Sequence, residues 1–171
     1  MSAPTFLPPE ALDIDTVAPD EFITEIDFDA INNVTSPEGR LEHMIALGRY
    51  DHRGPLITGD HFPVIGVGKH RFRNKTFHFG VDLRAWEAIE SMSYFGFMPG
   101  DHIQGLELGA AFPGLQLKGV IACLGYEARI NGTAHVMTLF RHRKERHLRC
   151  RDRDGTFLDH WRFLGVQEIT G

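Results

Sequence analysis

The sequence predicts an α+β fold in which a curved antiparallel sheet wraps around one buried central helix. Segment 83–95 is apolar around nearly its whole circumference, which is typical of a buried helix. Strand-like segments separated by turn signals fill 115–166. A helix of this kind must be covered on most sides and an antiparallel sheet on at least one face. The alternative is a closed β-barrel with helical plugs.

The first part of the chain differs in charge from the rest. Residues 1–40 contain nine acidic side chains and one basic side chain, and the other 131 of the 171 residues sum to +3. Four of the nine prolines fall in residues 1–20. We therefore expect an acidic, Pro-rich N-terminal arm over 1–33, with a short strand at 22–28. The rest, 34–171, has the length of a single domain.

Local signals place the next elements. Ser36-Pro37-Glu38 offers a capping hydroxyl, a proline at the first helical position and an acid in the first turn, so a helix should begin there and end near Gly48. Alternation in 62–81 predicts two strands joined by a turn at Asn74-Lys75. Asp82 is the expected N-cap of the apolar helix 83–95, which Gly96 should end.

The C-terminal third reads as a meander of at least four antiparallel strands. Asn131-Gly132 is the strongest hairpin signal in the chain and separates strands over 115–130 and 133–141. A turn at 143–145 precedes a charged strand over 146–152, and Asp154-Gly155 turns the chain into a last strand over 157–166. Such a sheet leaves edges to protect, which predicts a homodimer.

Composition excludes several classes of protein. No apolar run approaches the 18–20 or so residues that cross a bilayer, and the first residues lack the features of a secretory signal. Two cysteines are too few for a disulfide framework, so we expect a cytoplasmic protein with reduced thiols. No GxGxxG, GxxxxGK[ST] or GxSxG motif occurs. The net charge of −5 argues against a nucleic-acid partner.

His78 with Glu87 or Glu90 is the first candidate for catalysis. The histidine precedes the apolar helix and both carboxylates lie on it, and a histidine beside a buried carboxylate can transfer protons near neutral pH. We favour Glu90, because Arg84 would hold Glu87 ionised. In the alternative interpretation, both carboxylates lie on the solvent-exposed edge of the helix. Asp60 and His61, in a glycine-flanked loop, are the second candidate for catalysis. The alternative is that they only form a capped turn.

Basic side chains suggest where a substrate binds. In a strand over 146–152 and its continuation, Arg149, Arg151 and Arg153 would share one face, as in an anion site; the alternative is an edge strand charged to prevent pairing. Trp86 and Tyr94 on the apolar helix would contact the substrate. The ten histidines show no HExxH or cupin spacing. We therefore predict no metal or cofactor, although histidines distant in sequence could still assemble a metal site.

Two segments resemble the hot-dog superfamily of acyl-thioester dehydratases and thioesterases over roughly 62–168. They are the helix LRAWEAIESMSYFGF and the meander that ends in RDRDGTFLDHWRF. Gly59-Asp60-His61-Phe62-Pro63 is similar to the GHFP stretch of the dehydratases, although about twenty strand-like residues separate it here from the helix.

The resemblance implies an acid/base enzyme acting on an acyl thioester, either a 3-hydroxyacyl dehydratase or a thioesterase. The substrate would arrive on coenzyme A or on an acyl carrier protein. His78 or His61 would transfer protons together with a helix carboxylate. The alternative is a non-catalytic small-molecule-binding or interaction protein with an apolar pocket and an Arg-rich anion site.

Overall fold

A computed structural model describes residues 22–34 and 36–170 and shows an α+β chain, as predicted. The elements are β1 (Ile23–Asp27), α1 (Phe28–Val34), η2 (Pro37–Gly39), α2 (Arg40–Gly48), β2 (His52–Arg53), β3 (Lys69–His78), α3 (Ala85–Tyr94), β4 (Met98–Pro99), α4 (His102–Ala111), α5 (Leu115–Lys118), β5 (Ile121–Ile130), β6 (Thr133–His142), β7 (Glu145–Asp152) and β8 (Arg162–Ile169).

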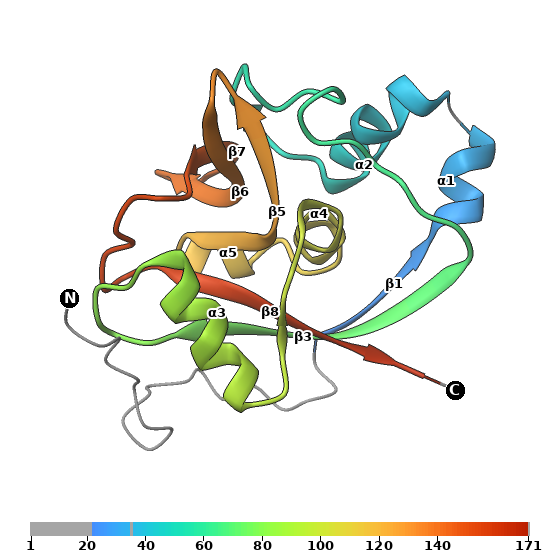
Figure 1. The fold of residues 1–171 in the computed structure, drawn as a ribbon. Helices are drawn as coiled ribbons and strands as arrows, with labels where there is room; N and C mark the ends of the chain where they lie inside the picture. Colours follow the sequence, from blue (N-terminus) through green and yellow to red (C-terminus); the bar gives the residue numbers. More distant parts are fainter. Residues whose placement is uncertain (1–21, 35, 171) are drawn as a thin grey trace.

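One open sheet of eight strands organises the chain. Its order is β1-β3-β8-β5-β6-β7-β2, with β4 paired to β8 beside this path. Among the described strands β1 and β2 do not pair with each other, so the closed barrel is wrong. Two antiparallel parts, β1-β3-β8 and β5-β6-β7, meet in a short parallel pairing of β5 with β8. Figure 1 shows the sheet bending where these two parts meet.

Both faces of the sheet are covered. In β5, Ile121 and Cys123 belong to one apolar core with α4, while Ala122 and Leu124 belong to a second core with α3. Successive side chains of a strand point to opposite faces, so α3 and α4 lie on opposite faces of the sheet. This explains the continuous apolar run 120–124, because a strand buried on both faces has no polar side.

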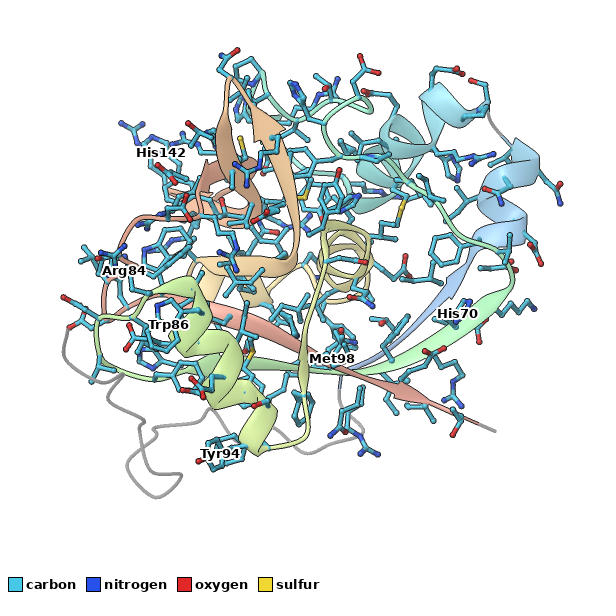
Figure 2. All side chains as sticks on the ribbon, in the orientation of Figure 1. His70, Arg84, Trp86, Tyr94, Met98 and His142 are labelled. Atoms are coloured by element: carbon cyan, nitrogen blue, oxygen red, sulfur yellow. The ribbon has the colours of Figure 1, made fainter. Side chains whose placement is uncertain are left out.

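The enclosed helix is α4, and the prediction that 83–95 is a mostly buried central helix is wrong. Trp86 and Tyr94 of α3 are 45% and 57% exposed, and Figure 2 shows Tyr94 projecting from the end of that helix. Small residues such as Ala85 and Ala88 form the face of α3 that meets the sheet. Figure 1 shows α4 along its axis, inside the bend, and it contacts α2, β1, β5 and β6.

Two of the predicted hairpins do not form. Strand β3 runs straight through Asn74, whose buried amide donates to the Phe22 carbonyl and the Thr24 hydroxyl of the N-terminal strand region. The last strand, β8, does not pair with β7 but lies between β3 and β5. The chain after Asp154-Gly155 instead forms a bridge between Phe157 and Leu83.

Other turn predictions are confirmed. Asn131 and Gly132 both have positive φ, 51° and 80°, and join β5 to β6, as a type I′ hairpin requires. Arg143, with φ 57°, lies in the turn between β6 and β7. The helix expected from Ser36 begins with the short 3₁₀ turn η2, continues as α2 and ends at Gly48.

The expected N-terminal arm is only partly described. The strand predicted at 22–28 is β1, which pairs with β3 and so belongs to the sheet. Residues 1–21, where most of the predicted arm falls, lie outside the described residues. Within 22–34 and 36–170, no helix combines the length and the apolar character needed to cross a membrane. The homodimer stays a prediction.

Candidate functional site

A pocket of about 450 Å³ lies between the 52–56 segment and β7. It is lined by imidazole, guanidinium, thiol and aliphatic groups: His52, Arg53, Leu56, His147, Arg149 and Cys150. A concave site in which several polar side chains converge is the usual form of a small-molecule site. We therefore take this pocket as the candidate functional site.

Strand register brings its side chains together. His52 of β2 lies opposite His147 in a parallel pairing, and His142 of β6 lies opposite Glu145 in an antiparallel one. Glu145, His147 and Arg149 are two residues apart on β7 and so share one face. Main-chain bonds from Asp51 to Arg146 and from Gly54 to Leu148 hold the 51–54 segment against that strand.

The histidines form a compact cluster. His52 Nε2 lies 2.8 Å from a Glu145 carboxylate oxygen, and the His52 and His147 rings are 4.6 Å apart between centroids. The ring of His142 lies 5.8 Å from that of His147, and Figure 2 shows His142 at the outer side of the β6–β7 hairpin. His52, Glu145 and His147 each offer a ligand atom within 4.8 Å of the others, so these three residues could hold a metal ion.

His147 is the buried member of the cluster. It is 9% exposed, and its Nε2 has no hydrogen-bond partner among the described residues. Burial, together with the neighbouring His52 and Arg149, holds the pKa of His147 below its ordinary value, although Glu145 opposes this shift. The ring is therefore neutral at pH 7, with a nitrogen lone pair available to a ligand.

Arg149 supplies the positive charge of the pocket. Its guanidinium lies over the Phe140 ring, 4.6 Å from the centroid, and no carboxylate in 36–170 is within ion-pair distance of it. Arg53, by contrast, is paired with Glu42 at 2.5 Å. Burial raises the pKa of the Cys150 thiol, so the neutral thiol rather than a nucleophilic thiolate faces the pocket.

The other predicted substrate-binding residues lie elsewhere. Arg151 is over the rings of Phe157 and Trp161 and donates to the Thr156 carbonyl. Arg153 is paired with Glu127, 3.2 Å away. Of the predicted basic row, only Arg149 therefore faces the pocket without a partner that neutralises it.

His78, Glu87 and Glu90 are not brought together as a proton-transfer pair. His78 Nε2 lies 3.1 Å from the Asp159 carbonyl oxygen, and no hydrogen bond or ion pair in the described chain joins it to either carboxylate. Glu87 accepts the main-chain N–H of Arg84 and so caps α3. Glu90 is exposed, so the burial on which its expected role depended is absent.

The Asp60–His61 loop is tied to the body of the protein. Asp60 lines a separate pocket of about 340 Å³ with Arg40 and Glu38. His61 makes local bonds to Leu56 and Thr58, and its carbonyl accepts the Tyr126 hydroxyl. These bonds within a turn fit the capped-turn alternative.

Sequence reasoning missed the histidine buried behind this loop, His102 at the start of α4. Its Nε2 lies 2.7 Å from the Pro63 carbonyl oxygen, and its ring lies near those of Phe62 and Tyr126. Burial holds the pKa of His102 below its ordinary value. The folded protein therefore keeps this ring neutral, with the proton on Nε2.

His102 should make stability depend on pH. As the pH falls below the ordinary histidine pKa, the unfolded chain takes up a proton that the folded chain resists, so stability is lost toward acid. We expect His102→Gln, which keeps a donor for Pro63, to reduce the loss between pH 7.5 and 5.5 by about 1 kcal/mol. Urea unfolding at both pH values measures it, and equal losses in variant and wild type would contradict this role.

Comparison with protein-family models, with curated proteins and with solved structures gives no match to this chain. Two members of the histidine cluster, His142 and His147, flank a predicted turn, which was a usable signal. His52 and Glu145 are 93 residues apart in the sequence, and no motif links them.

Proposed function

We propose that this protein binds a small anionic molecule in the pocket between the 52–56 segment and β7. The proposal rests on one observation: Arg149 lines that pocket and has no carboxylate partner among the described residues. A guanidinium makes strong, directional hydrogen bonds to phosphate or carboxylate oxygens. Contact with the Phe140 ring restrains the Arg149 side chain, which reduces the entropy lost on binding.

The pocket also suits the rest of such a ligand. Leu56 and Pro55 line it beside the charged groups, so an apolar portion of the ligand has a surface to contact. His52 and His147 supply ring nitrogens on the same wall. These features support the binding alternative of the sequence analysis, with Arg149 as the anion-binding residue.

Coenzyme A is the first ligand to test. It is a carrier of the acyl thioesters that the sequence predicts as substrates, and it has several phosphates. Arg149→Gln should weaken its binding by about 10- to 100-fold, the loss of one charge-assisted hydrogen bond. Isothermal titration calorimetry measures the change. Arg143→Gln removes an exposed arginine from the β6–β7 turn and is the matched control. Equal affinities in wild type and Arg149→Gln would place the anion elsewhere.

A turnover assay tests the thioester chemistry that the sequence predicts. Acyl-coenzyme A replaces coenzyme A, and free thiol released over time is followed with a thiol reagent. If the protein releases thiol and Arg149→Gln raises the KM of that reaction, the protein is an enzyme that acts at this pocket. Binding without release of thiol would exclude hydrolysis only, because dehydration of a 3-hydroxyacyl thioester keeps the thioester bond; a binding protein would also leave 3-hydroxyacyl-coenzyme A unconverted to the enoyl product.

A further inference from the structure

Three potential ligand atoms meet at the rim of the pocket, from two strands. The imidazoles of His52 and His147 and the carboxylate of Glu145 each place an atom within 4.8 Å of the others. Ligand atoms around a tetrahedral zinc ion lie roughly 3.3 Å apart, given metal–ligand distances of about 2.0–2.1 Å. Small rotations of these side chains would therefore enclose an ion.

His147 supplies a second, independent observation. This residue is nine-tenths buried, and its Nε2 has no hydrogen-bond partner among the described residues. A buried polar atom without a partner costs about 1–3 kcal/mol. Native proteins keep few such atoms, and each calls for an explanation. Coordination to a metal ion removes the cost, because the nitrogen lone pair then has a partner.

The backbone holds the donors in place. His52 and His147 are paired residues of parallel strands, and Glu145 is two residues before His147 on the same face. Arg146 N donates to Asp51 and Gly54 N donates to the Leu148 carbonyl, so bonds on both sides of His52 and His147 fix the two strands. The backbone of the three residues is therefore already ordered before an ion binds, and this lowers the entropy cost of binding.

We propose that His52, Glu145 and His147 bind a divalent transition-metal ion of the zinc class. Imidazole suits zinc, copper and nickel, whereas magnesium and calcium prefer oxygen ligands. Two histidines and one glutamate leave a fourth position open for water or a ligand atom. Since His52 and His147 also line the anion pocket, an ion there lies beside Arg149 and adds positive charge to the same wall.

The metal ion alone tests this inference, separately from the proposed anion binding. Untagged protein is titrated with Zn²⁺ by calorimetry, and Co²⁺ is added as a spectroscopic probe of tetrahedral coordination. We expect one ion per chain. His147→Ala, Glu145→Gln and His52→Ala should each weaken Zn²⁺ binding by at least about 10-fold, since even outer-shell changes cost 10–100-fold. His52 and Glu145 are partly exposed, so these two variants keep the fold.

His70→Ala is the matched control. His70 forms a similar surface pair with Glu168, 2.6 Å apart, but no metal-ligand cluster in the described chain includes it. Its removal should leave Zn²⁺ affinity unchanged. Absence of stoichiometric Zn²⁺ binding, or affinity that none of the three cluster variants lowers, would overturn the metal site. Coenzyme A binding that persists without Zn²⁺ would leave the anion pocket standing on its own.

Discussion

Replacing Arg146 by Met should lower the free energy of unfolding by about 3–5 kcal/mol, because two charge-assisted hydrogen bonds of about 1.5–3 kcal/mol each are lost. The guanidinium is buried and donates to the Gly48 carbonyl at the end of α2 and to the Gly109 carbonyl in the last turn of α4, both at 2.6 Å. It also lies over the Tyr50 ring, 4.4 Å from the centroid.

These contacts complete two helices at once. The last carbonyls of a helix have no partner within it and carry partial negative charge. One cation therefore caps α2 and α4 and fixes both against β7. Met replaces the aliphatic part of the arginine side chain but leaves both carbonyls unpaired, which is why the expected loss is large. Urea unfolding followed by circular dichroism measures it.

Arg149→Met, on the same strand, is the control. Its side chain is exposed and lies over Phe140, so the loss should stay within about 0.5 kcal/mol. Similar losses in both variants would show that Arg146 does not cap the helices.

Close packing against Tyr50 explains why each of these two helices has a glycine at the point of contact. A Cβ at Gly48 would lie 2.2 Å from the Tyr50 ring, and one at Gly109 would lie 2.1 Å from its hydroxyl oxygen. Tyr50 donates to the Leu106 carbonyl, and burial raises the pKa of its hydroxyl. The sequence indicated Gly48 only as a helix end. Its role in close packing depends on residues far away in the chain.

Helix α4 was missed although its start had a local signal. Asp101 and Gln104 form a capping box, in which each side chain accepts the other residue's main-chain N–H. This D-x-x-Q pattern before an apolar run predicts a helix. Two internal glycines, Gly105 and Gly109, lower its helix propensity and obscured the pattern. Tertiary contacts decide the helix, since Gly105 lets it approach Cys123 closely.

The burial of the 83–95 helix was predicted only in part. Its large apolar side chains recur every three residues, which suggested the buried face. Met92 of that row meets the sheet together with small residues such as Ala85 and Ala88, because small side chains allow close contact. Trp86 then lies partly exposed. Periodicity identified the helix and most of its packed side, but hydrophobicity alone did not show that Trp86 would be exposed.

The candidate site was predictable only in part. Arg149 was identified because alternation on one strand is a local property. The grouping of His52 with Glu145 depends on a parallel pairing of only two residues, His52 and Arg53 with His147 and Leu148. So short a strand has no sequence signature, since strands usually have about five or six residues. Sites formed by such pairings become visible only in three dimensions.

Gly125→Ala should lower the free energy of unfolding by about 2–3 kcal/mol through overpacking. Gly125 lies on β5 where the pairing with β6 shifts register, and its N–H donates to the Gly100 carbonyl at 2.8 Å. A Cβ there would lie 2.4 Å from the Pro99 carbonyl oxygen and 2.9 Å from the Asp101 nitrogen. Both are main-chain atoms, which cannot rotate away as a side chain can.

The displaced segment would be the one that joins the two parts of the sheet. Gly100 N donates to the Leu164 carbonyl of β8 while the Gly100 carbonyl accepts from Gly125 of β5, so residues 99–101 bridge the strands and lead directly into α4. Gly114→Ala is the control, because Gly114 has φ −71° and no atom within 4 Å of its Cβ. It should change stability by less than about 1 kcal/mol in urea unfolding. Equal stabilities of the two variants would mean that the 99–101 segment does not pack against β5 as described.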